Sequence, residues 1–174
     1  MEPLMVIDAI KDRRSTRRFD PEPLSPGVLE QLLEAARWAP SAGNRQPWHF
    51  YAVKDERKKL ELVEAAGGQD FIAEAPVVVV VCADPERSAK RYGDRGRDLY
   101  CIQDTAAAIQ NILLAAEERD LGTCWIGAFD EGACARVLDL TDQHRPVAMI
   151  PIGAKGMRPK PTSRRDLDEV VTYL

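Results

Sequence analysis

The sequence has few of the residues that build metal centres. It contains only two histidines, His49 and His144, and no pair of cysteines with C-x-x-C spacing. This scarcity argues against a zinc site, another His-based metal site or a disulfide framework, so we expect no bound metal. We expect instead free thiols, mostly buried, in a reducing cytoplasm, at the four widely spaced positions Cys82, Cys101, Cys124 and Cys134.

The sequence also lacks the short motifs of several nucleotide-binding and hydrolytic folds. It has no G-x-G-x-x-G, no G-x-x-x-x-G-K-[ST] and no G-x-S-x-G. These absences argue against a Rossmann dinucleotide site, a P-loop and a serine nucleophile elbow. There is no apolar run of transmembrane length, and the first residues do not read as a signal peptide, so we expect no membrane contact.

The overall charge is acidic. A net charge of −4 and a pI of about 5.3 argue against a dedicated nucleic-acid binder, because phosphate-backbone binding needs a wide basic surface. The 174 residues, of which 45% are hydrophobic and 30% charged, are enough for one domain with a real core. We therefore expect a single domain over residues 1–174 and no nucleic-acid partner.

Apolar periodicity predicts alternating helices and strands, which makes the fold α+β or α/β. Val77 to Val81 is a run of five valines, typical of a central strand buried on both faces. The polar stretch from Asp84 to Gly96 is expected to be an irregular excursion after that strand. The other predicted helices span 5–13, 25–40, 56–66, 70–75, 98–119 and 130–140, and the other strands 49–53, 123–129 and 147–152.

The helix predicted at 98–119 and the tail at 153–174 bear on assembly. The helix carries apolar residues on two sides, which fits either a core helix or a helix at a subunit interface, and the sequence leaves both open. The tail is basic and proline-rich, with little apolar content before Val170. Because it cannot build a core of its own, we expect it to be an arm that lies on another surface, such as a partner subunit.

Two segments carry groups suited to a phosphorylated heterocycle. Residues 13–19 hold four arginines and two hydroxyls, which predicts a phosphate site, with a solvated basic helix end as the alternative. The loop 40–48 lies between prolines and carries Asn44 and Gln46, whose amides suit the polar edge of a planar ring. An Asx turn beside a packed Trp48 is the alternative there.

Two more segments complete the set. The predicted strand that ends around Gly127 allows close backbone approach to a flat ligand, or it is a simple bulge. The tail is either a second cationic clamp for the same phosphate or a frayed end, and its basic residues are Lys155, Arg158, Lys160, Arg164 and Arg165. A phosphate site without a Rossmann or P-loop framework, next to groups for a ring edge, points to a mononucleotide-like ligand.

Four segments together resemble the nitroreductase family of FMN-dependent oxidoreductases, and the resemblance covers nearly the whole chain. They are RRSTRRF, APSAGNRQPWHF, QDTAAAIQNILLAAEERDLGTCWIGAF and IPIGAKGMRPKPTSRR, in this order. The resemblance implies an α+β sandwich with a mostly antiparallel sheet flanked by helices, assembled as an intertwined homodimer. It also implies two FMN molecules at the dimer interface, with each site built from both chains.

The resemblance implies that flavin N5 does the chemistry, so no protein side chain is expected to be catalytic. Hydride would pass from NADH or NADPH to the flavin and then to a nitroaromatic, a quinone or a similar electron-poor acceptor. The alternatives are reductive dehalogenation or flavin cleavage on the same fold, or a non-catalytic flavin-binding protein. The acceptor and the preference for NADH or NADPH stay open.

The resemblance also assigns residues to the cofactor. Arg13, Arg14 and Ser15 would hold the FMN phosphate and ribityl chain, and Arg17 the pyrimidine end of the ring. The loop would come from the opposite subunit, with Asn44 and Gln46 on the ring's polar edge and Pro40, Ser41 and Ala42 packed near it. Backbone at Ile126, Gly127 and Ala128 would face N5, and the tail would close on the phosphate through Gly153, Lys155 and Arg164.

Two features set this chain apart within the resemblance. Many relatives carry an acidic residue where this chain has Gly127, so any role of that carboxylate is lost while the backbone N–H is kept. The chain is also short, so the lid over the flavin must be small. We expect the lid within residues 84–96 and just beyond, with Tyr92, Arg95 and Arg97 as its substrate-facing residues.

Overall fold

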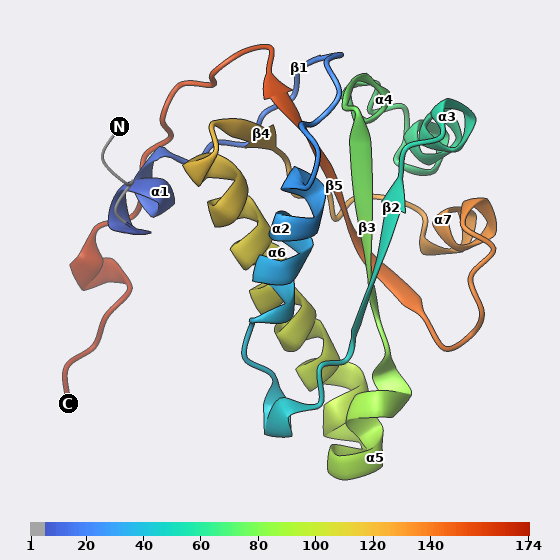
Figure 1. The fold of residues 1–174 in the computed structure, drawn as a ribbon. Coiled ribbons are helices and arrows are strands. Elements are labelled where there is room, and N and C mark those ends of the chain that lie inside the picture. The colour runs from blue at the N-terminus through green and yellow to red at the C-terminus, as the bar shows by residue number, and fades with distance from the viewer. Residues whose placement is uncertain (1–5) are drawn as a thin grey trace.

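A computed structural model describes residues 6–174, and its organising element is an antiparallel sheet between two layers of helices (Figure 1). The strand order is β1-β5-β3-β2, and β4 also pairs with β5. All strand pairs are antiparallel, which confirms the expected α+β sandwich. The strands are β1 (Phe19–Asp20), β2 (Trp48–Val53), β3 (Val77–Ala83), β4 (Leu121–Thr123) and β5 (Arg145–Lys155).

The valine run forms the centre of the sheet, as predicted. Every residue of β3 is buried, and β3 pairs with β2 on one side and β5 on the other. Because side chains alternate along a strand, Val77, Val79 and Val81 enter one core and Val78, Val80 and Cys82 enter a second. The strand therefore holds the two helical layers together.

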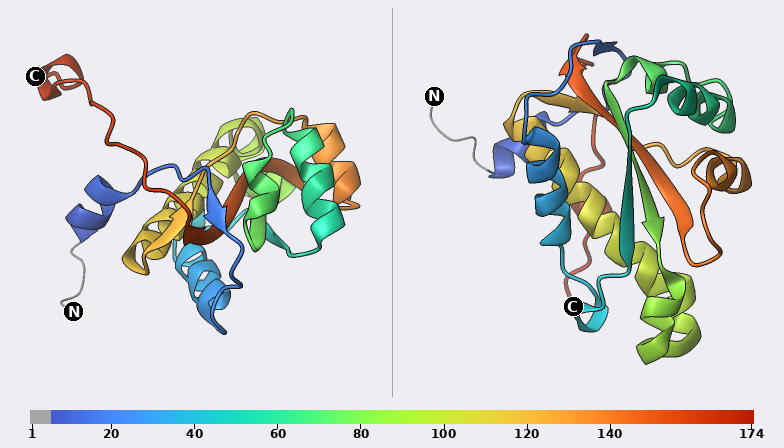
Figure 2. Two further views of the ribbon diagram at one scale, coloured as in Figure 1. Left: turned by 90° about the horizontal axis from the view of Figure 1, so that it is seen from above. Right: turned by 45° about the vertical axis from the view of Figure 1, so that its right-hand side comes forward.

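Each core is covered by its own helices, and Figure 2 shows the two layers on opposite faces of the sheet. The first layer contains α2 (Val28–Arg37) and α6 (Cys101–Glu118), and α1 (Val6–Asp12) contacts α6. The second layer contains α3 (Glu56–Ala65), α4 (Phe71–Glu74) and α7 (Glu131–Val137). α6 is long and contributes buried residues to the first core, which agrees with the interpretation of this segment as a core helix.

Residues 85–95 are helical with a kink at Gly93, so the expectation of an irregular excursion was wrong. The helix α5 (Pro85–Arg95) follows Asp84, whose carboxylate accepts the Arg87 N–H at 2.9 Å. This N-cap, with proline in the first turn, is a helix start that the polar composition obscured. A π-helical segment, Gly96–Tyr100, then joins α5 to α6, which consequently begins at Cys101 and not at residue 98.

Two other element boundaries differ from the sequence prediction. α2 begins at Val28 because Gly27, at φ 80°, is left-handed and separates the helix from the preceding Ser25-Pro26 turn. The strand predicted at 123–129 is replaced by β4, and beyond it only Ile126 bridges to the sheet, at Met149. The chain from Trp125 to Phe129 is thus loop, not strand.

In Figure 1, α1 and the tail that follows β5 lie on the same side of the sandwich, next to the layer of α2 and α6. α1 fits the predicted helix, whose first residue, Met5, lies outside the described residues. Residues 153–155 still belong to β5, and the extended tail follows with one 3₁₀ turn, Leu167–Glu169. Its role as an arm on a partner stays a prediction. Within residues 6–174 no helix has the length and apolar content needed to cross a bilayer.

Candidate functional site

The arginine-rich segment runs extended along the ends of two strands. The Thr16 N–H donates to the Thr123 carbonyl at 2.8 Å, and Phe19 pairs with Lys155. Gly122 makes this approach possible, because a Cβ there would lie 2.8 Å from Thr16 Cγ2. These contacts bring residues 13–20 together with the loop after β4 and with the start of the tail, as the assigned roles require.

Two cations of this segment have no acidic partner in the part of the chain that the structure describes. Among residues 6–174, no carboxylate forms an ion pair with Arg13 or Arg17. Burial raises the pKa of the Cys124 thiol, while Arg17, the Ser15 hydroxyl and Arg13 oppose that rise. Three of the residues assigned to FMN therefore gather around Cys124 and leave a positive field there.

Arg14 behaves differently from its neighbours. Its guanidinium donates to the carbonyl of Lys11 at 2.5 Å and to that of Arg13 at 2.9 Å. Lys11 lies in the last turn of α1, where a cation is favoured by the helix dipole. The helix-end interpretation thus describes the Arg14 guanidinium in this chain, and its contact with a phosphate stays a prediction.

The loop after β4 presents open backbone. Ile126 is buried, and its N–H and carbonyl each bond Met149 at 3.0 Å, which fixes the loop on the sheet. Gly127 and Ala128 are exposed, and no described atom lies within 4 Å of the place where a Gly127 Cβ would stand. Packing within the chain therefore does not require glycine there, whereas a flat ligand laid against the backbone would use the free space.

The loop 40–48 is rigidly held in a strained conformation. Asn44 and Gln46 have φ of 52° and 51°, a left-handed region that non-glycine residues rarely adopt. The Ser41 hydroxyl accepts the Gln46 N–H at 2.9 Å, and the Gln46 side-chain amide donates to Asn44 Oδ1 at 3.3 Å. Strain of this kind persists only where the surroundings impose it, and it concentrates at functional sites.

The anchor of this loop was missed by the sequence reasoning. The buried carboxylate of Asp104, on α6, accepts the Ala42 N–H. The signal was present, because Asp104 is the one carboxylate in the first four turns of a helix that is rich in apolar residues. An unpaired buried charge needs a hydrogen-bond donor, and the sequence alone could not show that the donor is 62 residues away.

The expected lid residues are part of a helical wall. Tyr92 lies edge-on to Tyr100, with ring centroids 5.2 Å apart, and its hydroxyl lies against Gly43 in the loop. Arg95 donates to the Tyr100 hydroxyl at 3.0 Å. Arg97 is paired with two acids, Glu86 at 2.9 Å and Asp94 at 2.7 Å. The idea of a small irregular lid is therefore corrected to a helical segment that supports the loop, and substrate contact stays a prediction.

The tail residues assigned to the phosphate have other contacts in this chain. A Cβ on buried Gly153 would lie 2.6 Å from Pro76 Cδ, so packing explains that glycine. The Lys155 ammonium pairs with Glu117 at 3.0 Å and Asp120 at 2.7 Å. Arg164 donates to Thr162 Oγ1 at 2.8 Å within the exposed tail. A phosphate would have to join or replace these contacts.

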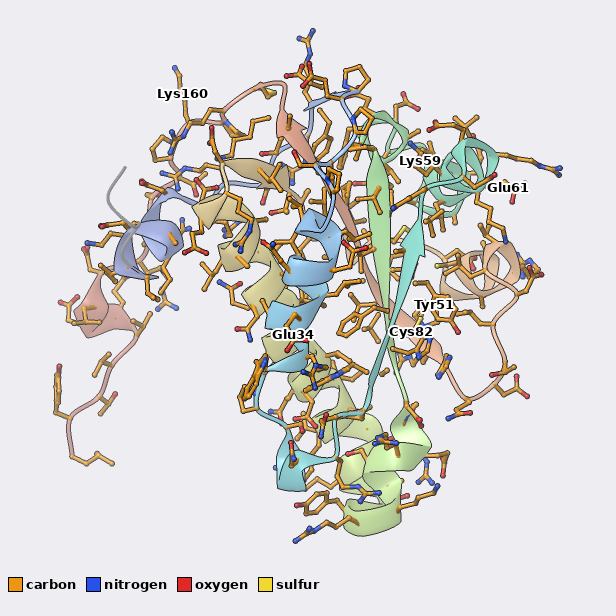
Figure 3. All side chains as sticks on the ribbon, in the orientation of Figure 1. Glu34, Tyr51, Lys59, Glu61, Cys82 and Lys160 are labelled. Atoms are coloured by element: carbon orange, nitrogen blue, oxygen red, sulfur yellow. The ribbon has the colours of Figure 1, made fainter. Side chains whose placement is uncertain are left out.

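The two halves of the site lie at opposite ends of α6. The loop is held at Asp104, near its start, and the arginine segment packs on Gly122, just past its end. An 18-residue helix is about 27 Å long. In Figure 3 the labelled Lys160, on the tail, lies at the end of the molecule opposite to α5. The single chain therefore does not bring the loop and the arginines together.

Both the sequence and the fold of this chain resemble those of known proteins. The model of the Nitroreductase family matches residues 10–69 and 60–154. A putative NADH dehydrogenase/NAD(P)H nitroreductase of Archaeoglobus fulgidus is 40% identical over 120 residues, which cover 69% of this chain and 66% of that protein. An FMN reductase [NAD(P)H] of Bacillus subtilis is 30% identical over 97% of this chain and 61% of its own length.

Solved structures agree with these matches. Nitroreductase A from Vibrio parahaemolyticus superposes with a TM-score of 0.89 at 27% identity, covering 97% of this chain and 74% of that one. The printed names agree with the expected enzyme class and with the expected FMN and NAD(P)H. Because the family model spans most of the chain, this protein belongs to the nitroreductase family of oxidoreductases, as its motifs predicted.

Proposed function

We propose that this protein is an FMN-dependent oxidoreductase that passes hydride from NAD(P)H, through flavin N5, to a nitroaromatic, a quinone or a similar electron-poor acceptor. The observation that carries the proposal is the charge of Arg13 and Arg17 near Cys124, in the loop whose backbone is open at Gly127. An anionic cofactor with a flat ring suits both features. The four free cysteines suit a reducing cytoplasm, where we propose the protein works.

The residues present fit FMN. Its phosphate needs cations that no acid already neutralises, and Arg13 supplies one. Its ring needs an open backbone edge, which Gly127 and Ala128 provide, and donors and acceptors for its polar rim, which Asn44 and Gln46 carry. Lys155 fits less well, since Glu117 and Asp120 already hold its ammonium.

FMN, when bound, supplies two-electron hydride chemistry that no side chain of this protein could perform. The protein's own part is to orient and to polarise. With FMN bound, Arg17 would place positive charge on the pyrimidine side of the ring and would stabilise negative charge there, as an oxyanion hole does. The strained loop keeps Asn44 and Gln46 in place before the cofactor arrives.

The complete site needs a second copy of the chain. The loop and the arginines are separated by the length of α6, and a homodimer would bring one chain's loop to the other chain's arginines. The exposed apolar residues of α1 support this, since Val6, Ile7 and Ile10 are 70%, 52% and 48% exposed. The exposed tail, with Leu167 and Tyr173, offers further apolar surface for the same interface.

The test begins with the purified protein and added FMN. We expect a yellow protein whose melting temperature rises with FMN and whose flavin is bleached by NADH or NADPH without oxygen. Re-oxidation by a panel of nitroarenes and quinones then identifies the acceptor class. A protein that neither binds FMN nor gains stability from it contradicts the proposal. Bound flavin that no nicotinamide reduces indicates a non-catalytic flavin binder, and loss of the flavin itself in air indicates flavin cleavage.

A further inference from the structure

Arg45 and Arg87 hold each other through their backbones. Arg45 Nε donates to the Arg87 carbonyl at 3.2 Å, and Arg87 Nε donates to the Arg45 carbonyl at 2.6 Å. Arg45 lies in the loop between Asn44 and Gln46, and Arg87 lies in the first turn of α5. The reciprocal bonds hold each guanidinium at the backbone of the other residue, and the terminal nitrogens of both make no hydrogen bond within residues 6–174.

A third guanidinium joins them. Arg91 follows Arg87 by one helical turn, and its Cζ lies 3.3 Å from the place of a Gly43 Cβ and 5.5 Å from the Tyr92 ring centroid. The name arginine triad is used below for Arg45, Arg87 and Arg91. All three are therefore gathered around one short loop.

No acid neutralises the arginine triad. Among residues 6–174 none of its members forms an ion pair, whereas Arg97 in the same region is paired with Glu86 and Asp94. Arg87 and Arg91, four residues apart on α5, repel each other, and an anion bound among the three arginines would relieve that repulsion. The arrangement is therefore that of an anion site, built by two segments 42 residues apart.

The position of the arginine triad narrows the choice of anion. Arg45 lies between the two residues assigned to the edge of the flavin, but its side chain reaches toward α5, which carries the other two arginines. An anion bound there would therefore belong to a molecule that meets the ring and extends from it over the protein. A nicotinamide dinucleotide is such a molecule, since only its nicotinamide meets the ring and its adenosine half extends over the protein. A phosphomonoester carries about −1.5 to −2 charge at pH 7, which matches several guanidiniums better than one carboxylate does.

We propose that the arginine triad binds the 2′-phosphate of NADPH and makes NADPH the preferred reductant over NADH. This inference rests on the proposed function and adds a site that the flavin itself does not use. NADH lacks the 2′-phosphate and leaves the three cations unpaired. NADPH brings an anion that each guanidinium fork can bind through two N–H groups.

The test compares both reductants in matched variants. Arg45→Gln and Arg87→Gln remove the charge while the glutamine amide still offers an N–H to the opposing carbonyl. We expect the KM for NADPH to rise at least about tenfold in each, with the KM for NADH unchanged, since each variant removes charge-assisted hydrogen bonds to the phosphate. Arg136→Gln is the control, because Arg136 is also exposed but lies on α7, across the sheet.

A binding measurement keeps the result independent of turnover. Calorimetry on the flavin-loaded protein should show that 2′,5′-ADP binds more tightly than 5′-AMP, and that both triad variants lose this difference. If either variant folds poorly, Arg91→Gln replaces it, since Arg91 makes no side-chain hydrogen bond within residues 6–174.

Three results would overturn the inference. One is a wild-type protein that uses NADH as well as NADPH, and another is equal binding of 2′,5′-ADP and 5′-AMP. The third is an equal rise of both KM values in the variants, which would assign the triad to the pyrophosphate that both cofactors share. A colourless protein that no nicotinamide reduces contradicts the proposed function instead, so the two failures are distinguishable.

Discussion

The carboxylate of Asp104 accepts the backbone N–H of Ala42 with both oxygens, at 3.1 Å and 3.2 Å. Asp104 is only 7% exposed, and burial raises its pKa while the Ala42 N–H opposes that rise. One buried charge therefore fixes the loop that carries Asn44 and Gln46. Removing the Asp104 carboxylate should therefore weaken FMN binding, although its side chain is not expected to contact the cofactor.

Two replacements of Asp104 distinguish the effect of its charge from the effect of its hydrogen bond to Ala42. Asp104→Ala leaves the Ala42 N–H without its acceptor, so we expect a loss of about 1–3 kcal/mol of folding free energy and weaker FMN binding. Asp104→Asn keeps an acceptor oxygen and should retain most of both. Urea denaturation and FMN titration measure the two effects. Equal FMN affinity in Asp104→Ala and the wild type would show that the loop does not depend on this anchor.

His144 should make stability depend on pH. Its Nδ1 lies 2.7 Å from the Tyr51 hydroxyl, and its ring stacks on His49 at 4.4 Å. Burial and then His49 lower the pKa of His144 below the ordinary histidine value of 6.5, against an opposing effect of Asp84. The unfolded chain therefore binds more protons than the native one just below pH 6.5, so this stability is present above that pH and is lost as pH falls through the lowered pKa.

The measurement for His144 is the melting temperature of the wild type and of His144→Gln from pH 8 to pH 5. We expect the wild type to lose more stability than the variant below about pH 6.5. The relevant face is visible in Figure 3, where the labelled Tyr51 lies on the α7 side of the sheet. Parallel curves for the two proteins would show that His144 titrates alike in both states.

Replacing two glycines near the site with alanine should affect the stability of the fold very differently. Gly122→Ala places a methyl group 2.8 Å from Thr16 Cγ2 in a buried contact, so we expect about 1–3 kcal/mol of destabilisation and a displaced arginine segment. Gly127→Ala meets no described atom within 4 Å, so the stability of the fold should change by less than about 0.5 kcal/mol. Thermal unfolding without flavin is the readout. Similar losses in both variants would contradict the close approach at Gly122.

The tail clamp is tested by charge reversal. If Arg14 and Arg164 address one phosphate, then Arg14→Glu and Arg164→Glu should each weaken FMN binding by about tenfold or more. Arg136→Glu, on the far side of the sheet, controls for the change in net charge. Arg164 gives the clearer test, because the acceptors of its hydrogen bonds in the structure are only its neighbours in the tail. Full flavin content in Arg164→Glu would remove the tail from the site.

The sequence predicted those helices and strands that are determined by neighbouring residues, such as an apolar run or an N-cap. The valine run identified β3, and Asp55 and Asp130 begin α3 and α7 by accepting the N–H groups of Lys58 and Ala133. α5 was missed because its one cap and its proline stand within a polar, charged stretch that has no apolar stripe. Periodicity measures burial of a helix face, and this helix buries little more than Ser88.

The candidate site, like the fold, could be predicted from the sequence only where the signal is local. The four segments could be named from the sequence because each contains a contiguous pattern of residue types. The contacts that join these segments could not be predicted from the sequence. The Asp104 to Ala42 hydrogen bond and the Arg45 to Arg87 pair connect residues that are 62 and 42 positions apart. Nor could composition show that Lys155 is already held by Glu117 and Asp120. Such contacts exist only once the helices are packed on the sheet.

The length of α6 has a genetic consequence. If the arginines and the loop meet only across two subunits, a variant damaged at Arg17 and one damaged at Asn44 are each inactive alone. Co-expressed, they form mixed dimers in which one site carries both defects and the other carries none. Two inactive genes would then restore flavin binding to part of the population, and the recovered fraction would report directly how often unlike subunits pair.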